Sequence, residues 1–456
     1  MPDKPKIIKF DIKIPRYISQ INKILLKNGY EAYIIGGAIR DSFIGKIPRD
    51  WDIASSATPE EVKRIFGDSA IPTGERFGTL TIIIGNRKTE ITTFRKEGPY
   101  LDKRRPDKVY FSRNLKDDII RRDFTINALA YDIWQKNLID YFNGLEDLKN
   151  KIIHTVGSPI ERFREDPLRM IRAIRFAVEL DFRISNETLN GMTKSSFLIN
   201  QVSFERIRDE LSKILLSPNP KDAFLYAHNT RLLEHILPEL SSCAYIPAYH
   251  ESPYTLFEHS ILTCENTAPD LKLRLAALLH DIGKPLTIEE DSAGRLRFFN
   301  HENVGAELAK TILTRLRYPN TLVEYVRKLI KWHMFNYEPN MKDKTIRKLV
   351  NSLGIDMIYD LVKLKHADKV ALGPDSFNDN NMKSFLDRIN RVLEKGPAVT
   401  IKDLAVDGKD IMKLLNIEEG PEVGRILKEI LDIVLDDPSI NSREKLIDII
   451  KTMGNN

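Results

Sequence analysis

The pattern of hydrophobic and polar positions divides the chain into a first part of mixed strands and helices and a longer helical part. Residues 32–35 form a short apolar run followed by two glycines, which predicts a strand, a turn and a helix. β-Branched residues at 79–84 and 89–94, separated by a Gly-Asn turn, predict a β-hairpin. From Pro159 onward the apolar residues recur almost only at helical spacing. We therefore expect an α/β head with a mixed sheet, followed by an all-α body.

Turn-forming segments mark the expected boundaries within the body. They lie at 155–159, 241–253 and 372–382, where Gly, Pro, Ser and Asn interrupt the helical pattern. The chain is thus predicted to contain four parts, at 1–155, 156–245, 246–375 and 376–456.

Composition limits the class of protein. Of 456 residues, 42% are hydrophobic and 30% are charged, which suits several packed cores and excludes a disordered chain. The only cysteines, Cys243 and Cys264, exclude a disulfide scaffold and a four-cysteine zinc module. No apolar run reaches ~18 residues and the start lacks a signal-peptide pattern, so we expect a cytoplasmic protein without membrane contact.

Two carboxylates in the head have the spacing of a metal site. Asp50 and Asp52 alternate with apolar residues, and strand geometry places such residues on one side. A divalent cation relieves the repulsion between the two carboxylates, although an exposed pair of this kind also occurs on plain strand edges. Glu90, on the second hairpin strand, is a candidate third catalytic carboxylate or equally a cross-strand partner for a basic residue.

A glycine turn and a basic segment suit a phosphate-bearing partner. Gly36 and Gly37 end the first strand, where phosphate can approach the backbone, and Arg40 adds a positive charge. No P-loop motif occurs in the chain. Residues 103–122 hold eight basic and three acidic side chains, a local excess of five that equals the net charge of +5. Such clustering favours contact with nucleic acid or a nucleoside triphosphate, the alternative being a solvated basic loop.

Four ordered segments resemble the bacterial class II tRNA nucleotidyltransferases, which comprise CCA-adding enzymes and poly(A) polymerases. They are GGAIRDSFIGKIPRDWDIA from Gly36, RRDFTINALAY from Arg121, EDPLRMIRAIRFA from Glu165 and SFERIRDEL from Ser203.

The resemblance implies a polymerase-β-like head, a neck and a tail that holds RNA, with CTP, ATP and a tRNA 3′ end as partners and no protein partner. It implies that Asp50 and Asp52 hold catalytic Mg²⁺. The residues implied to bind nucleotide are Gly36, Gly37, Arg40 and Arg122 at the triphosphate, Asp123 and Asn127 near the ribose, and Asp166, Arg169, Arg172 and Arg175 at the base.

The implied base template agrees with simple hydrogen-bond chemistry. Asp166 followed by Pro167 predicts a helix start, which would place Asp166 and Arg169 on one face. An acceptor beside a donor matches C and A, whereas U and G present the opposite order and leave buried groups unpaired. The alternative is that Asp166 only caps the helix.

A second constellation resembles the HD superfamily of metal-dependent phosphohydrolases. His280 and Asp281 are expected in the last turn of a helix that Gly283 stops. The implied ligands of an unidentified divalent metal (Mn, Mg, Ni or Fe) are His259, His280, Asp281 and Asp368, and His301 and His333 fit the extra positions of dinuclear members. In some tRNA nucleotidyltransferases a similar domain hydrolyses cyclic phosphates.

The sequence leaves rival activities open. A-only addition and poly(A) synthesis keep the same motifs. CC-only addition is disfavoured because the loop containing residues 102–105 is intact. A rival of another class is an HD phosphohydrolase whose head only binds RNA.

Overall fold

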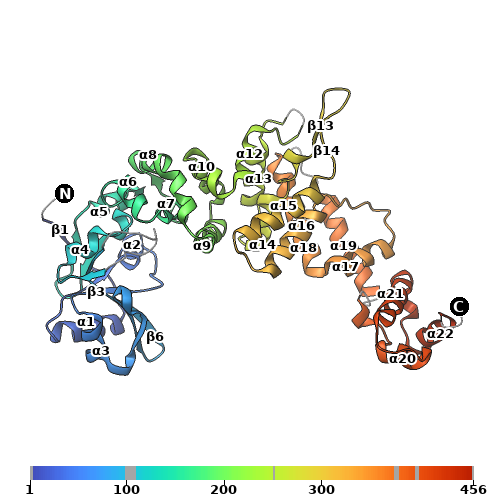
Figure 1. Cartoon of the computed structure of the whole chain (residues 1–456), viewed down its shortest axis with the longest axis horizontal. Coiled ribbons are helices and arrows are strands. Elements are labelled where there is room, and N and C mark those ends of the chain that lie inside the picture. Colours follow the sequence, from blue (N-terminus) through green and yellow to red (C-terminus); the bar gives the residue numbers. More distant parts are fainter. Residues whose placement is uncertain (1–3, 98–108, 250–251, 374–378, 396–399, 454–456) are drawn as a thin grey trace. The chain divides into compact units, whose positions relative to one another are not determined.

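The computed structural model describes residues 4–97, 109–249, 252–373, 379–395 and 400–453 (Figure 1). The loop at 102–105, and most of the first half of the basic segment 103–122, lie outside the described residues. The chain forms two compact units, 1–242 with 315–318 and 243–314 with 319–456. The division into four parts at 1–155, 156–245, 246–375 and 376–456 stays a prediction.

The head is built on a mixed eight-stranded sheet, as expected. Its strand order is β1(Lys6–Lys9), β10(Asn137–Asp140), β9(Leu129–Asp132), β2(Ala32–Ile35), β3(Asp52–Ser55), β6(Arg87–Thr93), β5(Thr79–Ile84) and β4(Ala70–Gly74). Strands β3 and β6 are parallel, and the other neighbours described in this sheet are antiparallel. The central β2 and β3 are buried, with Ile34 and Ile53 fully inaccessible, and this burial fixes the register in which the two strands pair.

The predicted elements of the head are present. Strand β2 leads through Gly36 into α2(Gly37–Phe43), so the second glycine already belongs to the helix, and β5 and β6 form the hairpin. Helices α1(Arg16–Lys27) and α3(Pro59–Phe66) each bury one apolar side, and a capping box at Thr58 and Glu61 begins α3.

Helices α4(Leu115–Ile120) and α5(Gly144–Asn150) still belong to the head, and the neck that follows consists of helices (Figure 1). The bounds of the neck helices are α6(Pro159–Glu165), α7(Leu168–Leu180), α8(Asn186–Ser195), α9(Phe204–Leu215) and α10(Pro220–Asn229). Helix α7 packs between α9 and α10, and α6 packs on α8.

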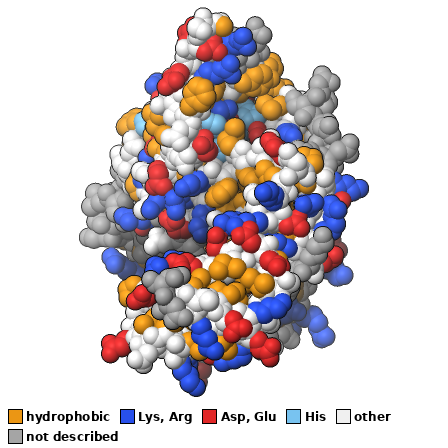
Figure 2. Space-filling view, turned by 90° about the vertical axis from the view of Figure 1, so that its right-hand side faces the viewer, with side chains coloured by type: hydrophobic (Ala, Val, Ile, Leu, Met, Phe, Trp, Pro, Cys, Tyr) orange, Lys and Arg blue, Asp and Glu red, His pale blue; other side chains and the backbone are white. Residues whose placement is uncertain are grey.

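The second unit is helical around a buried cluster of histidines. Its main helices are α13(Leu256–Glu265), α14(Leu271–Leu279), α15(His301–Arg315), α16(Asn320–Trp332), α17(Asp343–Leu353), α18(Ile355–Ala371) and α19(Asp379–Lys395). Figure 2 shows histidine side chains recessed among hydrophobic ones on the face that it draws.

The hydrophobic pattern missed two short strand pairs. Strand β11(Ile152–Ile153), at the end of the head, pairs in parallel with β12(Arg183–Ile184) of the body, and β13(Ile288–Glu290) and β14(Leu296–Phe298) form a hairpin within the body. Pieces of two or three residues are too short to show an alternating pattern.

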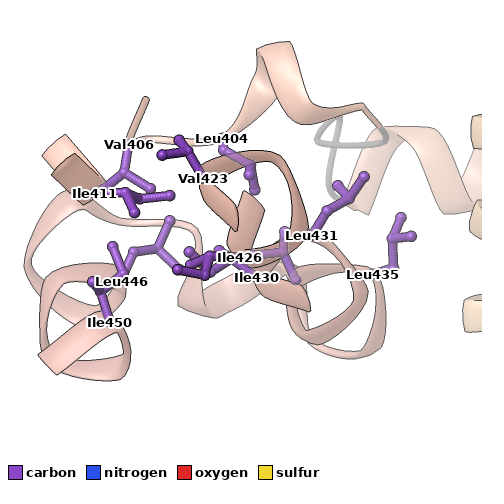
Figure 3. Packing of buried hydrophobic residues seen from close by; sticks show 11 residues of the cluster. Leu404, Val406, Ile411, Val423, Ile426, Ile430, Leu431, Leu435, Leu446 and Ile450 are labelled. Carbon is purple, nitrogen blue, oxygen red and sulfur yellow. The ribbon is translucent and has the colours of Figure 1, made fainter. Parts of the chain in front are cut away.

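The tail has a small core of its own. Helices α20(Gly408–Leu415), α21(Pro421–Asp436) and α22(Arg443–Met453) surround buried aliphatic residues, among them Ile411, Ile430 and Leu446 (Figure 3). The tail is therefore helical, as expected for the all-α body. Across the described ranges, no helix is both long and apolar enough to cross a membrane.

Candidate functional site

Asp50 and Asp52 lie at the start of β3, beside the end of β2. Asp52 is the first residue of β3 and pairs in register with Ile35, the residue before the glycine turn. Trp51 and Ile53 are buried and Asp50 is exposed, so the predicted alternation is confirmed. The predicted strand was too long at its start, because Asp50 and Trp51 precede β3.

Three carboxylates act on one another at this point. Burial, together with the negative charges of Glu90 and Asp50, raises the pKa of Asp52 to about 6, against the lowering effect of Arg122. Glu90 lies on β6, next to β3 in the sheet. A group of oxygen donors with excess negative charge fits a hard cation such as Mg²⁺.

The glycine turn lies directly beside two arginines. Gly36 has a φ of 70°, and a side-chain carbon there would lie 3.2 Å from Nη1 of Arg122. Arg122 donates to the fully buried Asp118 at 3.0 Å, and Arg40 donates to Oδ1 of Asn127 at 2.8 Å. Each guanidinium is thus oriented by a partner, next to backbone that phosphate can approach closely.

Asp123 links these residues to the neck. Arg172, on α7, donates to its Oδ2 from two nitrogens, at 2.7 and 3.0 Å, and Asn127 donates to its Oδ1 at 3.2 Å. Burial raises the pKa of Asp123, but Arg172 outweighs this effect and the pKa falls to about 2. Asp123 is therefore ionised and serves as an acceptor for several donors.

The predicted template residues lie at the junction of α6 and α7. Asp166 ends α6 in extended backbone, and the N-cap of α7 is Pro167, so the predicted N-cap was wrong by one position. Its Oδ1 still accepts from the Leu168 N–H at 3.1 Å. Arg169 is buried and donates to Oε2 of Glu165 at 2.7 Å and to the Arg121 carbonyl at 2.9 Å.

Phe176 joins the nucleotide-site arginines of head and neck. The guanidinium carbons of Arg40, Arg172 and Arg175 lie 5.1, 5.4 and 4.1 Å from its ring centroid. Arg175 also donates to Oε2 of Glu210 on α9 at 2.6 Å. Of the predicted residues, Arg40, Asn127, Asp123, Arg172 and Arg175 thus form one connected network.

The second unit holds two groups suited to a metal. In the first, Nε2 of His259 lies 3.0 Å from Oδ1 of Asp368, and Nε2 of His280 lies 3.7 Å from the same oxygen. In the second, Oδ1 of Asp281 lies 3.4 Å from Nε2 of His301 and 3.6 Å from Nε2 of His333.

Asp281 belongs to both groups through its two oxygens. Its Oδ2 faces the first group, 3.2 Å from Nε2 of His280 and 3.8 Å from Nε2 of His259, while Oδ1 faces the second. A carboxylate that turns one oxygen toward each of two ligand sets is the arrangement of a dinuclear centre. All six predicted residues are therefore brought together.

Backbone carbonyls orient the imidazoles. Nδ1 of His280, His301 and His333 lies 2.8, 2.7 and 2.6 Å from the carbonyls of Ala277, Phe298 and Ile330. A donated Nδ1–H leaves each Nε2 free as a ligand. Nε2 of His280 is buried without a hydrogen-bond partner in the described chain, which fits a site built for a cation.

The charge balance of this centre also fits a cation. Burial lowers the pKa of His280, but Asp281 and Asp368 outweigh it and raise the pKa to about 9. Lys284 lies 2.6 Å from Oδ2 of Asp281. Positive charge is therefore needed to hold the buried carboxylates.

The loop after α14 differs slightly from the prediction. The helix ends at Leu279 with His280 as C-cap, so His280 and Asp281 follow its last turn instead of lying in it. A side-chain carbon on Gly283 would lie 2.2 Å from the His301 carbonyl, so the loop passes very close to the start of α15.

Several residues of these sites escaped the sequence analysis. Arg206, Glu210, Phe176, Asp118 and Lys284 support the predicted residues, yet none was singled out. Two of them lie in the quoted segment SFERIRDEL. Periodicity shows that a helix has a polar face but not which charge on it turns inward.

Family profiles match three stretches of the chain. They are described as the poly A polymerase head domain at 32–154, the probable RNA- and SrmB-binding site of polymerase A at 181–243, and the HD domain at 256–372. Nucleotidyltransferase and HD domains are generally metal-dependent.

The similar curated proteins and solved structures are CCA-adding enzymes. The CCA-adding enzyme of Staphylococcus epidermidis is 32% identical over 94% of this chain and 95% of its own length, and that of Ligilactobacillus salivarius is 35% identical over 93% of each. The Bacillus stearothermophilus CCA-adding enzyme in complex with CTP matches with a TM-score of 0.74 and 26% identity, covering 97% of this chain and 98% of its own. The Thermotoga maritima enzyme complexed with tRNA shares the fold, with a TM-score of 0.56 and 20% identity over 98% and 96%.

Proposed function

The chain belongs to the family of CCA-adding enzymes, and we propose that it completes tRNA 3′ ends with CTP and ATP. The observation that carries this proposal is the electrostatic effect of Asp50 and Glu90 on Asp52, beside a glycine turn flanked by Arg40 and Arg122. The tRNA substrate and two free buried cysteines favour a cytoplasmic location.

The head residues suit nucleotidyl transfer. Asp50 and Asp52, with Glu90, would hold Mg²⁺, which when bound activates the RNA 3′-hydroxyl and neutralises charge at the α-phosphate. Arg40 and Arg122 bind the triphosphate along the Gly36-Gly37 backbone. Asn127 and Asp123, which hydrogen-bond to each other and to Arg40 and Arg172, would contact the ribose. Catalysis then depends on positioning and charge neutralisation, without a covalent enzyme intermediate.

The neck residues select the base. Asp166 accepts from the exocyclic amino group of C or A, and Arg169 donates to N3 of C or N1 of A. Arg169 must first release Glu165, to which it now donates. U and G offer a carbonyl where the amino group stands and leave buried groups unpaired, which accounts for their rejection.

Incubation with defined substrates tests the proposal. Transcripts of one tRNA that lack CCA, CA or A are each supplied with CTP, ATP or both, and the products are sequenced. We expect every transcript to be completed to CCA and extension to stop there. Addition of A alone, or a tail of many A residues, would instead assign the restricted or poly(A) activity.

We also propose phosphohydrolase activity for the HD domain. The two triads, which Asp281 links through its second oxygen, favour it. Each triad would hold one metal, and paired metals would stabilise the attacking and leaving oxygens of a phosphate ester. Imidazole and carboxylate donors suit Mn, Ni, Fe or Mg. The assay is hydrolysis of a 2′,3′-cyclic nucleotide by the purified chain supplied with each metal in turn.

A further inference from the structure

We propose that Arg206 on α9 is a positioning residue that holds the Asp166 carboxylate in the orientation that reads the base. This inference rests on the proposed function and extends it to a residue outside the template. It predicts that nucleotide choice is set partly by α9, a helix behind the base-reading residues.

The contact is well defined. Nη2 of Arg206 donates to Oδ2 of Asp166 at 2.7 Å, while the Leu168 N–H donates to Oδ1 at 3.1 Å. The side chains of Arg206 and Asp166 are only 19% and 14% exposed. Asp166 lies in extended backbone between two helices, so neither helix orients it. Two donors, one on each oxygen, are what fixes the plane of this carboxylate.

That fixed plane matters for selectivity. Each carboxylate oxygen has two lone-pair positions, so one on each remains for the exocyclic amino group of C or A. A carboxylate free to rotate would present its lone pairs less accurately to that amino group. Its advantage over the carbonyl of U or G would then shrink, because discrimination depends on buried groups being well paired.

A second residue of α9 acts on the same network. Glu210, four residues after Arg206 and 4% exposed, accepts from Nε of Arg175 at 2.6 Å and lies 3.7 Å from Nη1 of Arg172. Residues four apart share one helix face, so α9 turns a supporting face toward α7.

Arg206→Gln tests the inference with Arg206→Lys as the conservative variant. We measure kcat and KM for CTP and ATP, and misincorporation of UTP and GTP, on tRNA transcripts that lack CCA or A. Arg206→Gln should raise misincorporation relative to correct addition by about 10-fold or more, the scale of a lost charged hydrogen bond. Arg206→Lys should restore part of the selectivity. Arg208→Gln, on the same helix and paired with Asp209, serves as the matched control and should leave selectivity unchanged.

A double-variant cycle separates positioning from a structural role. If Arg206 acts through Asp166, adding Arg206→Gln to Asp166→Asn should change selectivity little further. Unchanged selectivity in Arg206→Gln, or equal effects in both backgrounds, would overturn the inference. A fall in the thermal midpoint with kcat and all KM values lowered alike would assign Arg206 to stability alone. A wild-type protein that adds no nucleotide would instead contradict the proposed function.

Discussion

At Asp52, function and stability oppose each other. Its pKa of about 6 lies above the ordinary value of 3.8 because burial, Glu90 and Asp50 all disfavour its charge. In metal-free protein the ionised form therefore destabilises the fold fully above pH 6, less as the pH falls, and not at all below 3.8. We predict that Asp52→Asn abolishes addition yet stabilises the metal-free head at pH 7 by on the order of 1–2 kcal/mol after solvent screening.

Calorimetry in EDTA from pH 7 to pH 4 measures this effect. The gain in thermal midpoint should shrink with falling pH, since protonated Asp52 resembles Asn. Asp68→Asn, an exposed acid of the same head, is the control and should leave the midpoint unchanged at each pH. A loss of stability in Asp52→Asn at pH 7 would show that the carboxylates do not strain the metal-free site.

At the scale of elements, the triad of Asp281, His301 and His333 depends on how closely the loop at Gly283 approaches helix α15. A side-chain carbon on Gly283 would lie 2.2 Å from the His301 carbonyl and 2.6 Å from the Gly305 nitrogen, so α15 must move to admit it. We predict that Gly283→Ala displaces His301, costs about 1–3 kcal/mol, and removes one of two bound metals. Metal analysis of the purified protein and its thermal midpoint measure both effects.

Gly424→Ala is the matched control for this change. It lies inside α21 with nothing within 4 Å of the added carbon, so it should keep the metal content and, if anything, stabilise the helix slightly. Gly283→Ala protein with full metal content and an unchanged midpoint would show that the loop adapts without α15.

The helices and strands also show which features of the fold and the site the sequence could predict. Local signals sufficed for β2 with its glycine turn and for the hairpin of β5 and β6, whereas the six residues of the second metal constellation came from the resemblance to the HD superfamily. The predicted ends of helices were less accurate, as at Asp166, because the position of a cap depends on the dihedral angles of a single residue. Pairs such as Asp123 with Arg172, or Asp166 with Arg206, join residues 40 or more positions apart. Periodicity carries no information about such distances, so the supporting residues emerged only from the fold.

For the whole molecule, the two candidate centres lie in different compact units, so their chemistry should be separable. We predict that Asp368→Asn, which removes a ligand but keeps the side-chain shape, abolishes hydrolysis of a 2′,3′-cyclic nucleotide and leaves CCA addition within about 2-fold of wild type. Asp52→Ala should do the reverse. Both assays run on the same full-length preparations, with thermal midpoints recorded to exclude misfolding.

Loss of addition in folded Asp368→Asn, together with retained addition in Asp52→Ala, would favour the rival in which the head only binds RNA. Loss of both activities in each variant would mean that the two units are coupled and that the metals serve one shared process.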